Sequence, residues 1–193
     1  DSVGVAARAA LAGDAGRLRR ALESSASGSG LYTIGNGTQP ELARHYADYA
    51  RALAERSGVE TLLTSFEAAR VLGVKRDGPL GVLALNAGIE AALGRDGPLQ
   101  TDTTHYHGRP ILITRNDYNL RLYNGDVGLC YVEDGQQLAA FRQPDGTLLR
   151  YLATRLPPHE TCFAMTIHKS QGSEFDEVAV VLPSAPEYGA ELQ

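Results

Sequence analysis

Apolar residues recur at helical spacing through the first hundred positions of the chain. This pattern predicts helices over residues 3–12, 14–22, 40–56, 59–68 and 80–93, and short apolar runs predict strands over 31–34 and 69–74. Asp14 stands where it can cap the second helix, and Pro40 followed by Glu41 is typical of a helix start. Tyr46 and Tyr49 lie on the apolar stripe of the third helix, where core packing explains them better than a ligand role.

The pattern changes to short alternating runs between Arg109 and Leu152. Asn124-Gly125 and Asp145-Gly146 are strong signals for tight turns between such runs. This spacing predicts a small antiparallel β-barrel over residues 106–160, with Pro157-Pro158 marking the return to the rest of the fold.

Two further apolar runs follow the predicted barrel. Residues 161–168 are expected to form a central strand, and residues 178–182 a buried strand. The sequence therefore predicts an α/β lobe made of residues 1–105 and 161–193, interrupted by the small β domain.

Composition narrows the class of protein. A net charge of −5 and a pI of about 5.5 argue against a protein that coats DNA through bulk charge, but not against one that grips a few phosphates. Cys130 and Cys162 lack metal-type spacing and are expected to be buried thiols. His105 and His107 have no third ligand nearby, so no metal site is predicted. The chain shows no secretory signal and no apolar run of about 20 residues, which favours a cytoplasmic protein without a membrane partner.

The stretch AMTIHKSQGSEFDEVAVVLP, from Ala164 to Pro183, carries the most chemistry. A β-run leads into a polar turn that contains glycine, and a second β-run follows. Open α/β sheets bind ligands where loops leave the carboxyl ends of their strands. The turn supplies hydroxyls, an imidazole, an ammonium, an amide and a carboxylate, which indicates a binding loop.

The string TIHKSQGSEF within that stretch resembles motif V of the superfamily 1B DNA helicases, most of all the RecD family, the alpha subunits of exodeoxyribonuclease V. GRPILITRNDYNLRLYNGDVG and KRDGPLGVLALNAGIE are similar to two more segments of that family, in the family's order. The resemblance covers about Val71 to Pro183 and is loose before that. It implies the second RecA-like motor lobe of a P-loop NTPase, with an SH3-like barrel inserted in it.

No G-x-x-x-x-G-K-[ST] phosphate loop occurs in the chain, and the family's arginine-bearing motif VI lies beyond the matched segment. We therefore expect a fragment of a larger motor, with no catalytic residue and no ATP turnover of its own. The resemblance implies that the parent uses ATP and Mg²⁺, with the Mg²⁺ ligands outside this fragment, to move 5′ to 3′ on single-stranded DNA. It also implies the beta and gamma subunits of exodeoxyribonuclease V as partners in double-strand-break repair.

The resemblance also implies roles for single residues, because motif V begins against DNA and ends against the nucleotide. The DNA-binding candidates in the motif are Thr166, His168 and Lys169, and Lys169 equally suits a brace for the loop. The nucleotide-binding candidates are Gln171, Gly172, Glu174 and Arg76, with Gly172 expected to allow close approach or a positive φ. Arg76 equally suits a solvated surface cation. Phe175 is expected in the core and Asn86 in a structural role.

Arginines and tyrosines interleave between residues 109 and 123, an arrangement that suits a single nucleic-acid strand, where bases stack and phosphates pair. Arg115 and Asn116 are the DNA-binding candidates of this segment, whereas Asn124 and Gly125 are what a hairpin needs in any case. Two other interpretations stay open for the whole chain. One is a stand-alone RecD-like or relaxase-linked helicase, and the other is a non-catalytic nucleic-acid or protein adaptor.

Overall fold

The computed structural model describes residues 2–23, 39–95 and 97–182, and the chain divides into two compact units, Asp1–Gly35 and Asn36–Gln193. In the first unit, α1 (Ser2–Leu11) packs on α2 (Ala15–Glu23) and buries Ala9. Gly13 turns the chain between the helices with φ +66°. Asp14 accepts a hydrogen bond from the Arg17 amide at 2.8 Å, which confirms the predicted cap. The predicted strand at 31–34 lies outside the described residues.

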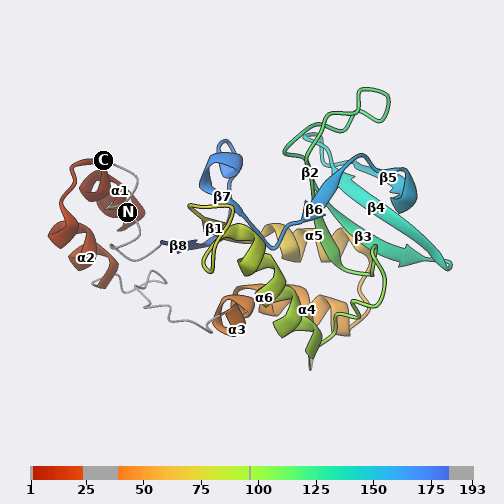
Figure 1. The fold of residues 1–193 in the computed structure, drawn as a ribbon, viewed down its shortest axis with the longest axis horizontal. Coiled ribbons are helices and arrows are strands. Elements are labelled where there is room, and N and C mark those ends of the chain that lie inside the picture. Colours follow the sequence, from red (N-terminus) through yellow and green to blue (C-terminus); the bar gives the residue numbers. More distant parts are fainter. Residues whose placement is uncertain (1, 24–38, 96, 183–193) are drawn as a thin grey trace. The chain divides into compact units, whose positions relative to one another are not determined.

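The helices of the second unit frame two separate sheets (Figure 1). They are α3 (Gln39–Leu42), the 3₁₀ turn η1 (Ala43–Tyr46), α4 (Ala47–Ala54), α5 (Val59–Glu67) and α6 (Val82–Arg95). The predicted helix over 40–56 is thus broken by a 3₁₀ turn. Its tyrosines are core residues as expected, because Tyr46 and Tyr49 are fully buried with Phe66 and Phe163 in one aromatic cluster.

The first sheet is parallel and has β1 (Ala69–Gly73) between β7 (Ala164–Thr166) and β8 (Glu177–Val181). The predicted single central strand over 161–168 is wrong. Its first residue ends β6 (His159–Thr161) of the other sheet, while Ala164–Thr166 forms a strand with β1 as its sheet partner. The chain changes sheets because the Cys162 amide donates to Pro110 on one side and Phe163 fills the aromatic core on the other.

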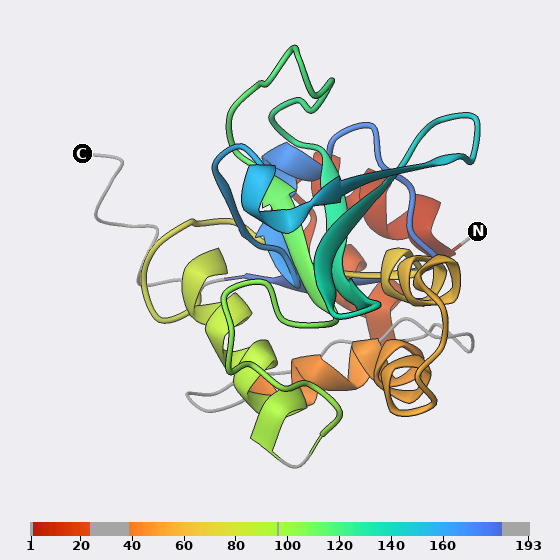
Figure 2. The same ribbon diagram turned by 90° about the vertical axis from the view of Figure 1, so that its right-hand side faces the viewer.

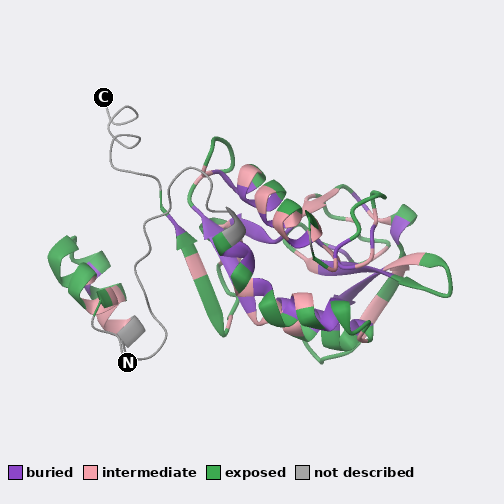
Figure 3. Cartoon of the chain, turned by 90° about the horizontal axis from the view of Figure 1, so that it is seen from below, coloured by how far each residue is buried: buried purple, intermediate pink, exposed green. Residues whose placement is uncertain are grey.

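Strand β8 also departs from its prediction as a buried strand. Val178 and Val180 are 44% and 49% exposed, and Val181 is the residue of this strand that is buried (Figure 3). The physical reason is its position, since β8 pairs with β1 on one side and no described residue pairs with its other edge. Sequence hydrophobicity reports the strand itself but not whether another layer covers it.

The second sheet is antiparallel, in the order β5-β4-β3-β2-β6. It contains β2 (Arg109–Ile113), β3 (Val127–Glu133), β4 (Gln136–Arg142), β5 (Leu148–Leu152) and β6, with the 3₁₀ turn η2 (Ala153–Arg155) before β6. Within the described residues no ladder joins β5 to β6, so the sheet is open and the expected SH3-like barrel is not confirmed. Gly125 and Gly146 have φ of +106° and +85°, which confirms both predicted turns.

The strands of this sheet are curved (Figure 2), and the sheet carries a compact apolar core. The core contains Ile111, Ile113, Leu122, Cys130, Ala139 and Phe141. Cys130 and Cys162 are both buried as predicted, and burial raises the pKa of these thiols to about 12 and about 11. Both therefore stay protonated at neutral pH.

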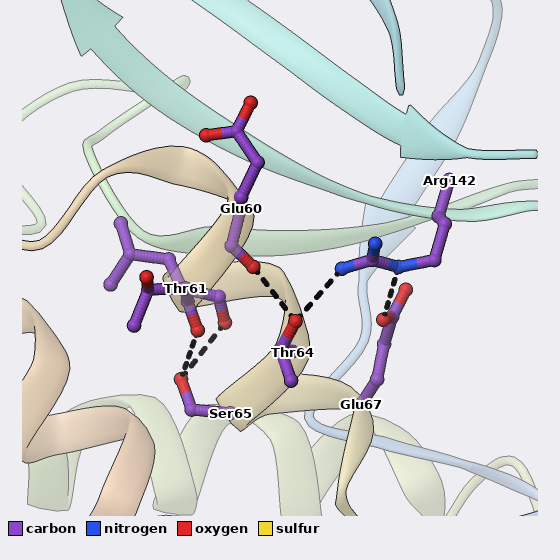
Figure 4. A network of polar contacts seen from close by, with 7 residues as sticks. Glu60, Thr61, Thr64, Ser65, Glu67 and Arg142 are labelled. Atoms are coloured by element: carbon purple, nitrogen blue, oxygen red, sulfur yellow. Dashed lines mark hydrogen bonds and ion pairs between the residues drawn. The ribbon is translucent and has the colours of Figure 1, made fainter. Parts of the chain in front are cut away.

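Helix α5 is tied to the antiparallel sheet by an arginine on β4 (Figure 4). The Arg142 guanidinium donates to Glu67 at 2.8 Å and to the Thr64 hydroxyl at 3.0 Å, and Arg150 donates to Glu60 at 2.7 Å. Because α5 also leads directly into β1, it holds the two sheets in a fixed relation.

Candidate nucleic-acid and nucleotide face

Three strand ends meet at one edge of the parallel sheet. Gly73 at the end of β1 pairs with Thr166 at the end of β7 and with Val181 at the end of β8. The segments that leave β1 and β7 therefore start from the same carboxyl edge, where open α/β sheets bind ligands. These two segments contain Arg76 and the first half of the candidate motif.

Thr166 precedes the 3₁₀ turn η3 (Ile167–Ser170) at this edge, and His168 and Lys169 lie within it. The Thr166 hydroxyl accepts a hydrogen bond from the Lys169 amide at 3.4 Å and so caps the turn, while its own hydrogen remains free to donate. The His168 imidazole is exposed and has no hydrogen bond or ion pair to any described residue. The turn thus presents one imidazole and one ammonium at the sheet edge.

One carboxylate binds both cations at this edge of the sheet, and it was not identified from the sequence. Glu160 on β6 binds the Arg76 guanidinium through two contacts, 2.8 Å and 3.2 Å, and lies 3.5 Å from the Lys169 ammonium. Burial acts to raise the pKa of Glu160, but the hydrogen bond from Arg76 and the nearby charge of Lys169 outweigh it and lower that pKa. No local pattern marked Glu160, because Arg76 lies 84 positions away in sequence.

Replacing Glu160 with glutamine is expected to lower the free energy of unfolding by about 1 kcal/mol at neutral pH. The folded-state pKa of Glu160 is depressed, so its stabilisation is present above the unfolded pKa of about 4.3 and is lost as pH falls through the folded value. Urea unfolding of both proteins between pH 7 and pH 3 measures this, and the difference should shrink at low pH. Glu133→Gln, which removes a more exposed ion pair with Arg150, is the matched control and should change less. A difference in stability between the unchanged chain and Glu160→Gln that stays constant with pH would contradict the stabilising role of the ionised Glu160.

The second half of the motif crosses from the carboxyl end of β7 to the amino end of β8. Gly172 turns this crossover with φ +85°, the positive φ that the sequence predicted for it. Phe175 is half-buried rather than fully in the core, and its ring lies 5.1 Å from the guanidinium carbon of Arg70. Phe66 covers Arg70 at 4.2 Å, and Arg70 donates to the Cys162 carbonyl at 3.0 Å. The buried arginine thereby anchors the end of the crossover to β1.

No hydrogen bond or ion pair within the described residues joins Arg76 to Gln171 or Glu174, the other side chains predicted to bind the nucleotide. Gln171 and Glu174 are exposed, and the Glu174 carboxylate has no hydrogen bond or ion pair within the described part of the chain. Arg76 instead stands with Lys169, on either side of Glu160.

Arg115 and Asn116 belong to the loop between β2 and β3. The Asn116 carboxamide accepts from the Asn124 amide at 2.8 Å and donates to the Tyr118 hydroxyl at 3.3 Å, so it braces the loop. Arg115 is exposed, without an ion pair to the described residues. The structure shows no contact between this pair and the motif residues at the sheet edge.

Asn86 on α6 has the structural role expected for it. Its side chain is buried and bonds both polar groups of the Ala164 backbone, donating to the carbonyl at 2.9 Å and accepting from the amide at 2.8 Å. The carboxamide therefore acts as an extra strand partner for β7.

The described residues contain no group of three His, Cys, Asp or Glu side chains that could hold a metal ion. His105 lies beside His159, with ring centroids 5.4 Å apart, and His107 accepts a hydrogen bond from the Val132 amide. Among the described helices none has the length and apolarity to span a membrane.

Comparison with known proteins identifies relatives through sequence, although no protein-family model matches the chain. RecD of the RecBCD enzyme from Haemophilus influenzae is 42% identical over 130 residues, which are 66% of this chain and 19% of that protein. RecD from Mycolicibacterium smegmatis is 34% identical over 187 residues, 95% of this chain and 33% of that protein. The ATP-dependent RecD2 DNA helicase from Deinococcus radiodurans is 32% identical over 120 residues, 61% of this chain and 16% of that protein.

A solved structure of Pif1 helicase from Bacteroides aligns with 77% of this chain and 43% of its own, at 16% identity and a TM-score of 0.33. The sequence matches are stronger, and the chain spans between 16% and 33% of the length of the three curated relatives named above. This chain is therefore homologous to the RecD and RecD2 proteins over the larger part of its length.

Proposed function

We propose that this chain is part of the ATP-dependent 5′-3′ DNA helicase subunit of exodeoxyribonuclease V, acting in double-strand-break repair and recombination. It would supply most of the second RecA-like lobe, residues 1–105 and 161–193, with the unit 106–160 inserted. The observation that carries the proposal is the placement of the motif. The string that resembles motif V leaves the carboxyl edge of a parallel sheet, next to a cluster of two cations and one carboxylate.

The DNA track is proposed to begin at the turn after β7. Thr166 and His168 can donate hydrogen bonds to phosphate oxygens, and Lys169 adds a charge, so the turn suits the backbone of a strand rather than its bases. Arg115 is a second proposed phosphate contact, whereas the contacts of Asn116 support a role in holding the loop.

The nucleotide face is proposed at the crossover, where Gln171, Gly172 and Glu174 stand. The exposed carboxylate of Glu174 can accept hydrogen bonds from ribose hydroxyls or bound water. The described residues offer no carboxylate cluster for Mg²⁺, so they fit ATP and Mg²⁺ only as one side of a site shared with another lobe. When bound, ATP with Mg²⁺ supplies the hydrolysis that drives lobe movement. Arg76 can offer a phosphate the guanidinium N–H groups that its two contacts with Glu160 leave over, since its side chain is half-exposed.

The proposed partners are single-stranded DNA and the beta and gamma subunits of exodeoxyribonuclease V, in the cytoplasm. The match to a RecD2 helicase from Deinococcus radiodurans supports a second candidate, a stand-alone RecD-like helicase. Co-purification of tagged protein with beta and gamma subunits separates the two candidates, since the stand-alone enzyme would purify without them.

Binding of the chain to a fluorescent dT oligonucleotide tests the DNA track. Lys169→Ala is expected to weaken binding and to reduce the slope of log K against log salt by about 0.7, because one phosphate contact is lost. His168→Ala should weaken binding by about 1 kcal/mol at neutral pH with little change in slope. Arg51→Ala removes an exposed arginine elsewhere and serves as the control. If the chain binds no oligonucleotide at low salt, or if Lys169→Ala leaves the slope unchanged, the proposed track is wrong.

A further inference from the structure

The loop between β2 and β3 projects away from its sheet (Figure 1). Two of its aromatic side chains are exposed. Tyr118 is 75% exposed and Tyr123 is 45% exposed. Their rings meet edge to face, with centroids 6.1 Å apart and planes at 72°. Aromatic side chains contribute most to stability when buried, so two exposed rings in contact do little for the fold.

The backbone of this loop is nevertheless held in one conformation. The Asp117 carboxylate accepts from the Asn119 and Leu120 amides at 3.0 and 3.1 Å, and Asp117 and Leu122 exchange backbone hydrogen bonds of 2.7 and 3.0 Å. Leu122 is fully buried in the apolar core, and Tyr151 donates to the Leu120 carbonyl at 2.6 Å. The rings are therefore presented by an ordered loop, which reduces the entropy lost when a ligand binds them.

The acidic side chains of the loop have hydrogen-bond partners, whereas its arginines have no ion pair to a described residue. Asp117 and Asp126 are occupied by backbone amides, the second through the Tyr123 amide at 2.7 Å. Arg115 and Arg121 are exposed and have no ion pair with any described residue. The same loop thus carries two exposed guanidinium groups, which have no ion pair to a described residue, and two exposed rings, on a chain whose net charge is −5.

We propose that Tyr118 and Tyr123 form a stacking platform for unpaired bases of single-stranded DNA, with Arg115 and Arg121 binding the phosphates on either side. Aromatic rings beside cations are how proteins hold single strands without reading sequence. A cavity of about 590 Å³ next to the loop, lined in part by Asn119, Arg121 and Tyr151, gives a neighbouring nucleotide room. This inference rests on the proposed function and adds to it a place where bases, rather than phosphates, are bound.

The test compares two oligonucleotides of equal length, one of dT and one abasic throughout, by fluorescence anisotropy with the full chain. Tyr118→Ala and Tyr123→Ala should each weaken binding to dT on the order of tenfold, while binding to the abasic strand changes little. Tyr118→Phe and Tyr123→Phe keep the ring and should bind dT as the unchanged chain does. Urea unfolding of all four variants should give similar midpoints, because the rings are exposed.

Each other outcome overturns the platform in a distinguishable way. Alanine variants that bind dT normally refute it and leave the proposed function standing. Equal losses for dT and the abasic strand show that the tyrosines support the loop rather than stack with bases. Normal dT binding with lost binding to purified beta and gamma subunits assigns the loop to a protein partner instead. If the unchanged chain binds neither strand, the proposed function fails together with this inference.

Discussion

Phe163→Ala is expected to lower the free energy of unfolding by about 3–5 kcal/mol. Phe163 is fully buried and packs against three other rings, with centroids 5.4 Å from Tyr46, 6.4 Å from Tyr49 and 6.3 Å from Phe66. It stands between β6 and β7, where the chain passes from one sheet to the other. Removing the ring leaves a cavity at the junction of both sheets, which the surrounding strands cannot close without moving.

Denaturant unfolding at equilibrium measures this loss. Phe163→Leu retains much of the buried volume and should cost clearly less than the alanine variant. Tyr118→Ala removes an aromatic ring of similar size that is 75% exposed, and it should change stability by less than about 0.5 kcal/mol. If Phe163→Ala costs no more than Tyr118→Ala, the aromatic cluster does not hold the two sheets together.

The local parts of the fold follow from the sequence. The helix over 59–68 and the strand over 69–74 match α5 and β1 to within a residue, because helical spacing of apolar positions marks the first and a short apolar run marks the second. Gly125 and Gly146 fix their turns through a backbone conformation that side chains disfavour, so these turns need no information from elsewhere in the chain.

The predictions that the structure does not bear out share a different cause, since each of these features depends on contacts between segments that are distant in sequence. The apolar run over 161–168 reads as one strand, and only the packing of Phe163 and the hydrogen bond from Cys162 to Pro110 divide it between two sheets. The exposure of Val178 and Val180 depends on what covers β8, which a local pattern does not contain. The expected closed barrel needs a pairing of its first and last strands that the described residues lack.

The candidate site also has a part that the sequence predicts and a part that depends on distant contacts. Thr166, His168 and Lys169 come together because they are neighbours in sequence, so the motif alone was enough to group them. Arg76 joins them through Glu160, across 84 positions, and no sequence signal placed it there. The nucleotide role that the resemblance implies for Arg76 stays a prediction, and in the structure Arg76 shares the Glu160 carboxylate with Lys169.

Asn86→Leu is expected to lower the free energy of unfolding by about 2–5 kcal/mol, although leucine has a similar size. The carboxamide satisfies both the amide and the carbonyl of Ala164, and the substitution leaves two buried polar groups unpaired. Because β7 leads directly into the turn that carries His168 and Lys169, the same variant should weaken dT binding even where it remains folded. Asn119→Ala removes an exposed carboxamide and is the matched control, with an expected change below about 0.5 kcal/mol.

Asn86→Asp makes it possible to test the two hydrogen bonds of this side chain one at a time, by changing the pH. An ionised carboxylate still accepts from the Ala164 amide but cannot donate to the Ala164 carbonyl, and burial disfavours its charge, so its folded-state pKa should be raised. A group with a raised pKa contributes most below its unfolded pKa, about 3.9 for aspartate, and that contribution is lost as pH rises through the folded value. The deficit of Asn86→Asp should therefore be small near pH 4 and grow toward pH 8, while that of Asn86→Leu stays constant. Urea unfolding of the unchanged chain and of each variant across this pH range measures the two losses of stability. If the loss caused by Asn86→Asp does not vary with pH, the hydrogen bond from Asn86 to the Ala164 carbonyl does not stabilise β7.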